Sequence, residues 1–258
     1  MSDTRLSQRQ QDILGQIASG GAQQIEDLAR RYGLTSQSIR RDINVLCSLG
    51  LARRLHGGVD LPVLPQNAPV NARSQLHGAA KRRIAARIAR DIPDGSTVFL
   101  GIGTTVQFTA EALREHARLT VVTNNLDVAV VLGAATGIEL HVTGGLWRAN
   151  DRDVVGLEAI RYFEKFHATH AVVGAGGLHP DIGVLDFTYS DAQITNAILQ
   201  NSRTCYLAAD ASKWTRAAAV RVAPFSKFSF LVTDRLPDDP KILDSNLGGL
   251  EVIVCPER

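Results

Sequence analysis

The sequence predicts an α/β protein in two parts, a small helical unit that ends in a hairpin and a larger domain built on a mostly parallel sheet. Within residues 1–60, three short apolar helical faces are separated by glycines. From Gly95 onward, short apolar runs alternate with helical stretches, a pattern typical of a parallel sheet with helices on both faces. Residues 61–69 contain three prolines and no charge, which indicates a linker. We therefore expect a first domain at 1–60, a linker at 61–78 and a second domain at 79–258.

The first domain is expected to contain three helices followed by a hairpin. Gly20-Gly21 stops the first helix and Gly33 stops the second, because glycine suits a helix end and weakens a helix interior. The third helix runs from about Ser36 to Leu49, with Thr35 as its N-cap. Short strands are expected at Leu51–Arg54 and Val59–Leu61, around the tight-turn sequence His56-Gly57-Gly58.

The third helix has an apolar face and a polar face. Ile39, Ile43 and Leu46 share the apolar face, so we assign them to the core. The opposite face suits base edges in double-stranded DNA, since arginine bonds guanine and asparagine or glutamine bonds adenine. Arginines on the hairpin suit phosphate or minor-groove contacts. The predicted DNA-binding residues are Ser36, Gln37, Ser38, Arg40, Arg41, Asn44, Arg53, Arg54, His56 and Gly57. The alternative is an ordinary three-helix bundle with a solvated arginine face.

Charge is distributed unevenly along the chain. Residues 1–60 carry 8 basic and 6 acidic side chains, residues 71–90 carry 6 basic and no acidic ones, and residues 91–258 carry 14 basic and 20 acidic ones. A positive first third suits a polyanionic partner. We interpret the basic helix expected at 79–91 as a connector between the domains, with direct DNA contact as the alternative.

The composition excludes several classes of protein. Hydrophobic residues make up 45% of the chain and charged residues 21%, which fits a globular protein. There is no run of about 18 apolar residues, so no membrane span is expected, and the polar N-terminal residues lack a secretory signal. The three cysteines have neither zinc-ligand nor redox-motif spacing. We expect a cytoplasmic chain without a metal or other cofactor.

The second domain is expected to bind a ligand at the ends of its strands. The candidate strands are Thr97–Leu100, Thr120–Thr123, Glu139–Thr143, Ala171–Gly174, Cys205–Ala208, Leu231–Thr233 and Val252–Val254. Ligands of open α/β sheets bind outside the carboxyl ends of the strands, and backbone N–H groups at a helix start suit a phosphate. The predicted effector-binding residues are Gly103, Thr104, Thr105, Thr123, Asn124, Asn125, Gly144, Gly145, Gly176, Asp186 and Lys213. The alternative for each loop is a purely structural turn.

The third helix and the hairpin carry a family pattern. Residues 34–43 read Leu-Thr-Ser-Gln-Ser-Ile-Arg-Arg-Asp-Ile, and residues 55–58 read Leu-His-Gly-Gly. This combination resembles the signature of the DeoR family of bacterial repressors, whose DNA-binding domain is a winged helix-turn-helix. The resemblance implies that Arg40 and Arg41 contact operator DNA and that Asp42 has a structural role.

The resemblance extends over the second domain, where family sensor motifs match at 101–105, 122–125, 143–145, 174–177 and 210–213. It implies a sensor domain similar to ribose-5-phosphate isomerase that binds a phosphorylated sugar or polyol. Residues 183–189 and 201–203 resemble the branch that controls the glycerol-3-phosphate regulon, which implies glycerol-3-phosphate as an effector. The chain departs from the family in having Gly101 in place of the usual Asp, Asp191 in place of a common Glu, and Thr195 in place of a basic residue.

Together these observations predict a ligand-controlled transcriptional repressor. We assign no catalytic residue, because general acid–base chemistry needs a positioned carboxylate and Gly101 replaces one. A homo-oligomer, either dimer or tetramer, is expected, since one short helix reads too few base pairs for specific binding. Two alternatives stay open: a sugar-phosphate isomerase with an appended DNA-binding domain, and a regulator whose sensor domain responds to nothing. The segment 148–153 is expected to be a solvated loop.

Overall fold

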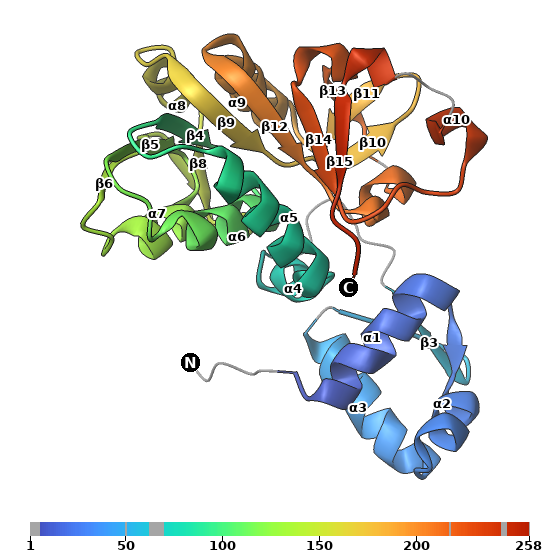
Figure 1. Cartoon of the computed structure of the whole chain (residues 1–258). Helices are drawn as coiled ribbons and strands as arrows, with labels where there is room; N and C mark the ends of the chain where they lie inside the picture. The colour runs from blue at the N-terminus through green and yellow to red at the C-terminus, as the bar shows by residue number, and fades with distance from the viewer. Residues whose placement is uncertain (1–5, 50, 62–69, 217, 244–246, 258) are drawn as a thin grey trace. The chain divides into compact units, whose positions relative to one another are not determined.

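A computed structural model describes residues 6–49, 51–61, 70–216, 218–243 and 247–257. The chain divides into two compact units, Met1–His77 and Gly78–Arg258, and each is considered by itself (Figure 1). The predicted linker contains a short helix, α4 (Val70–Gln75), and Leu76 packs against the core of the first unit. The division between the units falls after residue 77, at the end of the predicted linker. The proline-containing stretch 62–69 lies outside the described residues.

Besides α4, the described part of the first unit contains three helices and a small antiparallel sheet. The elements are α1 (Gln8–Gly20), β1 (Gln23–Gln24), α2 (Ile25–Tyr32), α3 (Ser36–Ser48), β2 (Arg53–Leu55) and β3 (Gly58–Asp60). The strands lie in the order β1-β3-β2, so the β2–β3 hairpin forms a wing beside the helices. The predicted winged helix-turn-helix is confirmed.

The helix ends form where the sequence predicts them. Thr35 Oγ1 accepts a hydrogen bond of 3.2 Å from the Ser38 N–H, which satisfies one of the unpaired donors at the start of α3. Gly33 has a φ of 63°, a left-handed conformation that ends α2 without steric cost. The capping box at α1, in which the side chains of Ser7 and Gln10 each accept from the other's backbone N–H, was not predicted.

The hairpin begins later than predicted. Leu51 and Ala52 are 0% and 5% exposed and belong to the core, so β2 starts only at Arg53. The strand β1 was not predicted, because two residues are too few to show a periodic pattern. It pairs with β3, placing Gln23 opposite Val59, and thereby anchors the wing to the segment between α1 and α2.

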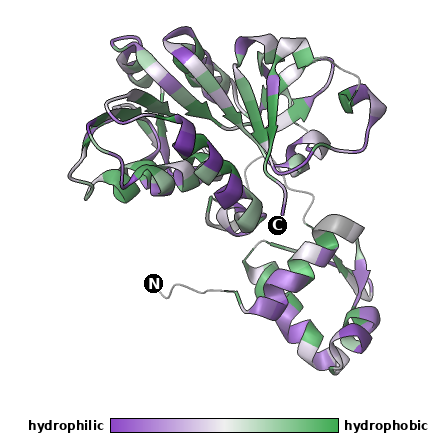
Figure 2. Cartoon of the chain, viewed as in Figure 1, coloured by the Kyte–Doolittle hydropathy of each residue, from purple (hydrophilic) through white to green (hydrophobic). Residues whose placement is uncertain are grey.

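The core of the first unit draws on all three helices and the wing. Side chains exposed by 1% or less are Ile13, Ile17, Leu28, Ile39, Ile43, Leu46, Leu51 and Val59. Figure 2 shows polar and apolar stretches alternating along α1 and α3, as expected for helices that bury one face. The inner face of α3 is therefore occupied by the core, and its outer face is left to solvent or a partner.

The second unit is built on a seven-stranded sheet with the order β15-β14-β12-β9-β4-β5-β6, in which every pairing is parallel. The strands are β4 (Thr97–Leu100), β5 (Leu119–Thr123), β6 (Ile138–Val142), β9 (Ala168–Val173), β12 (Ser202–Ala208), β14 (Phe230–Thr233) and β15 (Glu251–Val254). Each of them overlaps one of the predicted strands. The predicted mostly parallel α/β domain is confirmed.

Helices cover both faces of this sheet (Figure 1). The helices α5 (Gly78–Asp91), α6 (Thr104–Leu113) and α7 (Leu126–Leu132) lie on one face, and α8 (Leu157–Phe163) and α9 (Tyr189–Gln200) lie on the other. Alternate residues of a strand serve opposite faces. In β4, Val98 and Leu100 pack with α5, α6 and α7, whereas Phe99 packs with α8 and α9. Because both of its faces are buried, the segment from Val98 to Leu100 of β4 reads as a continuous apolar run.

Five short strands of the second unit were not predicted. They are β7 (Leu146–Arg148) and β8 (Asp153–Val155), which form a hairpin, and β10 (Gly177–His179), β11 (Gly183–Asp186) and β13 (Val220–Ala223), which form an antiparallel sheet. The expectation of a solvated loop at 148–153 is wrong, since Asp151 is 8% exposed and Asp153 is completely buried. No helix within the described ranges is long and apolar enough to cross a membrane.

Candidate functional site

The outer face of α3 presents the predicted base-reading side chains. Those that are exposed are Gln37, Arg40, Arg41 and Asn44. Ser36 and Ser38 are half-buried in the first turn of the helix. Among the described residues, neither arginine is held in an ion pair, so both guanidinium groups are available to a base or a phosphate. DNA contact by this face stays a prediction.

The wing offers fewer free hydrogen-bond donors for DNA than its sequence suggests. Its exposed residues include Arg53, Arg54, His56 and Gly57. The Arg53 guanidinium lies 2.8 Å from the Asp60 carboxylate and also donates to the Leu61 carbonyl oxygen at 3.1 Å. Arg53 therefore links the two strands of the hairpin, and part of its guanidinium group is already used within the chain. Gly57 at the tip has a φ of 76°, which glycine adopts without strain.

Asp42 ties α3 to α1. Its side chain is buried, and its two carboxylate oxygens accept from Arg9 Nε at 2.7 Å and from Gln10 Nε2 at 3.0 Å. The hydrogen bond and charge of Asp42 raise the pKa of Arg9. The implied structural role of Asp42 thus has a physical basis. Its partners could not be identified from sequence, because they lie more than 30 residues away on another helix.

The predicted effector motifs gather at the carboxyl edge of the parallel sheet. The order of strands reverses at β4, with β5 and β6 on one side and β9 and β12 on the other. Such a switch point opens a crevice where open α/β sheets bind ligands. The loops after β4 and β9 touch there: the Gly101 N–H donates to the Val172 carbonyl oxygen at 3.0 Å, and a Cβ at Gly174 would lie 3.2 Å from the Ile102 carbonyl oxygen.

The start of α6 differs from the starts of α7, α8 and α9. Its N-cap is Gly103, with a φ of 116° and no side-chain hydrogen bond to the first turn. By contrast, Asn125 caps α7, Thr188 caps α9, and Glu158 lies in the first turn of α8. The start of α6 also carries the two buried hydroxyl residues Thr104-Thr105 and no acidic residue. Its first-turn N–H groups are therefore suited to an external acceptor.

Two residues of the motif after β5 have structural hydrogen bonds. Thr123 Oγ1 donates to the Leu100 carbonyl oxygen at 2.6 Å and accepts from the Asn125 N–H at 3.0 Å. The Asn125 amide donates to the Gly101 carbonyl oxygen at 3.4 Å. Both side chains are buried. They hold the end of β5 against the end of β4, and any effector contact they make stays a prediction.

The neighbouring Asn124 is completely buried and only partly satisfied. Its Nδ2 donates to the Val154 carbonyl oxygen at 2.9 Å, while its Oδ1 has no hydrogen-bond partner among the described residues. The same holds for the buried Oγ1 of Thr143, at the end of the adjacent strand β6. A buried polar atom without a partner is costly, which makes these two atoms candidates to bind ligand hydroxyls or water. Gly144-Gly145, which follow, are exposed.

The remaining predicted residues lie on the β9 and β12 side of the crevice. Gly176 lies so close to Asp186 that a Cβ at Gly176 would be 2.8 Å from Asp186 Oδ1. The same oxygen accepts from the Phe187 N–H at 2.9 Å. Lys213 lies in the short 3-10 helix η1 (Ala211–Thr215) after β12, and η1 packs against β10. The structure thus places Lys213 beside the loop after β9. That loop lies between Lys213 and the loop after β4.

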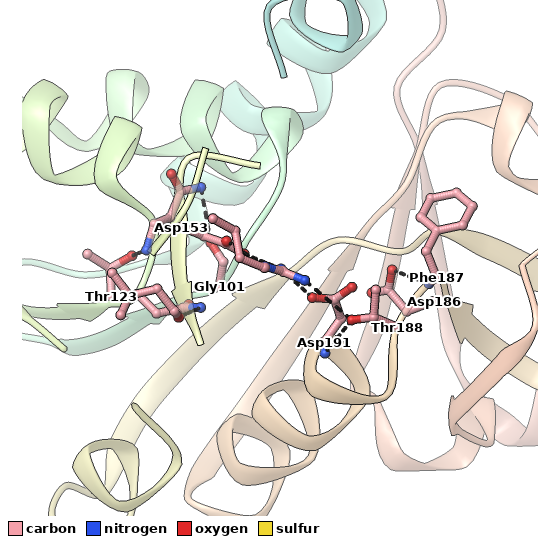
Figure 3. Close-up of polar contacts among 11 residues, drawn as sticks. Gly101, Thr123, Asp153, Asp186, Phe187, Thr188 and Asp191 are labelled. Atoms are coloured by element: carbon pink, nitrogen blue, oxygen red, sulfur yellow. Dashed lines mark hydrogen bonds and ion pairs between the residues drawn. The ribbon is translucent and has the colours of Figure 1, made fainter. Parts of the chain in front are cut away.

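An ion-pair network at this edge was not predicted. Arg148 in β7 contacts Asp153 of β8 through Nε at 2.9 Å and Nη2 at 2.5 Å, and its Nη2 also lies 2.5 Å from Asp191 in α9. Its Nη1 donates to Thr188, the N-cap of α9, at 3.3 Å. Figure 3 shows these contacts running from Asp153 to Asp191 and Thr188. The network joins the β7–β8 hairpin to the start of α9. Sequence offered no signal for it, because Asp191 lies 43 residues from Arg148.

The charged side chains of this network are largely buried from water. The Arg148 side chain is 18% exposed, that of Asp191 is 4% exposed and that of Asp153 is completely buried. Burial lowers the pKa of Arg148, but the hydrogen bonds and charges of the two carboxylates outweigh it and raise that pKa. Burial raises the pKa of Asp153 against the opposing influence of Arg148. Arg148 therefore counteracts the effect of burial on the pKa of Asp153.

Comparison with known proteins identifies both units. Residues 9–63 match the model of the DeoR-like helix-turn-helix domain, and residues 76–235 match that of the DeoR C terminal sensor domain. The chain belongs to the DeoR family. It is 34% identical to the glycerol-3-phosphate regulon repressor of Haemophilus influenzae over 90% of this chain and 91% of that protein. It is 33% identical to the transcriptional repressor CsqR of Escherichia coli over 97% of this chain and 95% of that protein.

Likeness to solved structures is weaker. Ribose 5-phosphate isomerase A from Methanocaldococcus jannaschii gives a TM-score of 0.40 at 14% identity, over 54% of this chain and 55% of that chain. Similarity at this level carries no argument about activity. The relatives named above are regulators, which supports a regulator rather than an enzyme. Within the residues that the structure describes, no three His, Cys, Asp or Glu side chains form a group that could hold a metal.

Proposed function

We propose that this DeoR-family regulator represses transcription by binding operator DNA through α3 and the wing, and that a phosphorylated sugar or polyol controls its affinity. The observation that carries the effector proposal is the start of α6. It lies at the switch point of the sheet, has no side-chain cap and has no acidic residue in its first turn. Such a helix start favours a phosphate, since its N–H groups and its dipole both attract an anion.

The rest of the crevice suits a hydroxylated ligand. Asn124 Oδ1 and Thr143 Oγ1 are buried without partners among the described residues, and either could accept a hydrogen bond from a hydroxyl group. Lys213 adds a positive charge on the β12 side. Because three relatives are named glycerol-3-phosphate regulon repressors, glycerol-3-phosphate is the first effector to test.

DNA recognition on this proposal uses paired half-sites. One α3 helix offers four exposed base-reading side chains, too few for a specific site, so at least a dimer is needed. A ligand can release such a dimer from DNA only if it binds the low-affinity state more tightly than the high-affinity one.

A regulator fits this edge of the sheet better than an isomerase does. General acid–base catalysis needs a carboxylate positioned toward the substrate. Asp153 and Asp191 are instead both paired with Arg148. Incubation of the chain with ribose 5-phosphate should accordingly give no product. Turnover that disappears in an Asp153→Asn variant would favour the enzyme instead.

The test is a thermal-shift screen with phosphorylated sugars and polyols, each beside its dephosphorylated form, because a ligand of the native state raises its stability. Glycerol-3-phosphate should raise the melting temperature, and glycerol should not. The same compound should then weaken binding to a duplex that the wild-type chain has selected from a random library. Thr105→Val should reduce the shift, whereas Thr204→Val, on β12, should leave it unchanged. No shift with any phosphate would overturn the effector proposal and leave the DNA-binding proposal standing.

A further inference from the structure

We propose that the contact between Arg82 of α5 and Phe108 of α6 transmits effector binding to the DNA-binding unit. This inference rests on the proposed effector site at the start of α6, and it names the residues through which that site acts. The guanidinium carbon of Arg82 lies 4.8 Å from the centre of the Phe108 ring, a cation–π contact.

Phe108 is directly coupled to the start of α6. It follows Thr104 by four residues, so the two side chains lie on one face of the helix, about one turn apart. Both side chains are buried. A ligand that orders or shifts the first turn of α6 therefore moves Phe108 with it, because a helix turn transmits displacement as a rigid unit.

Arg82 joins this ring to the start of α5. Its Nη1 lies 3.4 Å from the position that a Cβ would occupy at Gly78, the first residue of α5. Arg82 also acts on Glu111, one turn beyond Phe108: burial raises the pKa of Glu111, and the charge of Arg82 opposes that rise. The guanidinium group thus interacts with the first turn of α5 and with two positions along α6.

The direction of α5 brings its first turn to the carboxyl edge of the sheet. Its last residue, Asp91, is followed within six residues by the first residue of β4, so the end of α5 lies at the amino edge. A helix of 14 residues spans roughly 21 Å, which places Gly78 near the opposite edge. The hydrogen bond of 3.1 Å from Arg83 Nε to the carbonyl oxygen of Cys255, just after β15, agrees with this direction.

The start of α5 is also the point where the second unit joins the first, since the units divide between His77 and Gly78. Farther along the helix, Ile84 and Ile88 are completely buried in the core and fix its position. Arg82 is exposed, so its contact with Phe108 can change without opening the core. A change at the effector site therefore reaches the covalent connection to the DNA-binding unit through an adjustable surface contact.

The first experiment measures coupling as the ratio of duplex dissociation constants with and without saturating glycerol-3-phosphate. Arg82→Gln and Phe108→Leu should lower this ratio by about 2- to 5-fold, the size of an exposed cation–π contact, and together should lower it no further than either alone. Arg82→Lys should retain most of it. Lys165→Gln removes the similar contact with Tyr162 on α8, on the other face of the sheet, and should leave the ratio unchanged.

The second experiment needs no effector. Coupling between sites is reciprocal, so binding of the selected duplex must alter the start of α6. Hydrogen exchange of residues 103–110 in the full chain should change when the duplex binds, and this change should be lost in Arg82→Gln. An unchanged exchange rate in the wild type, or an equal change in the variant, overturns the proposal.

The two experiments separate the two claims. If the duplex alters exchange at residues 103–110 in the wild type and not in Arg82→Gln, but glycerol-3-phosphate has no effect on duplex binding, the transmission contact stands and this effector is rejected. If glycerol-3-phosphate acts on the wild type and equally on Arg82→Gln, the effector stands and the transmission contact is rejected.

Discussion

Replacing Arg148 by methionine should destabilise the second unit strongly and in a pH-dependent way. The change removes the partner of two buried carboxylates, Asp153 and Asp191. Removing one partner of a buried pair costs about 3–5 kcal/mol. Because Arg148 retains 18% side-chain exposure, we expect the lower end, about 3 kcal/mol, at pH 8.

The loss should shrink toward acid pH. Burial already raises the pKa of Asp153, and removing Arg148 removes the influence that opposes this rise. In the variant, the folded state then binds a proton more tightly than the unfolded state, so its stability falls as pH rises through the raised pKa. The difference from wild type should accordingly be smaller at pH 5 than at pH 8.

Urea denaturation followed by tryptophan fluorescence measures this effect in the relevant unit, because both tryptophans of the chain, Trp147 and Trp214, lie in it. The double variant Arg148→Met, Asp153→Asn is the matched control, since it removes the stranded charge and should recover part of the stability. A loss below about 1 kcal/mol, or an equal loss at both pH values, would refute the reasoning that Arg148 sustains buried charge.

Three further changes test other parts of the chain. Thr35→Ala should destabilise the first unit by about 1 kcal/mol in urea denaturation followed by circular dichroism, because α3 loses its cap. Arg41→Ala should weaken binding to the selected duplex by about 1–3 kcal/mol if it contacts guanine, while Arg30→Ala on α2 should not. Lys213→Ala should abolish the response to glycerol-3-phosphate in the same binding assay and leave DNA affinity intact.

The elements that the sequence predicts well are those with long periodic patterns or clear end signals. The helix α3 has both, with an apolar stripe, an N-cap at Thr35 and a glycine before it, and its predicted start is confirmed. The strands of the parallel sheet are short but apolar on both faces, which distinguishes them from the intervening helices. These patterns are local, so they can be recognised from the sequence without knowledge of the fold.

What the sequence could not show depends on residues that meet only in the folded chain. Asp153 reads as part of a polar loop in the sequence, whereas in the fold it pairs with Arg148, which also binds the distant Asp191. Asn124 and Asn125 look equivalent in sequence. In the structure Asn125 caps α7, while Asn124 keeps an unpartnered buried oxygen among the described residues. Asn124 instead donates to Val154, 30 residues away, and periodicity does not encode such a contact.

The two faces of α3 separate the residues that the fold requires from the residues that can be substituted without affecting the fold. Ile39 and Ile43 are at most 1% exposed, and Asp42 is fixed by α1, so foldability constrains these positions. Arg41 and Asn44 project outward and have no part in the core. On the proposed mode of DNA binding, exchanging the outer side chains of α3 changes the preferred operator at little cost in folding, and a library randomised at these positions samples altered DNA specificity.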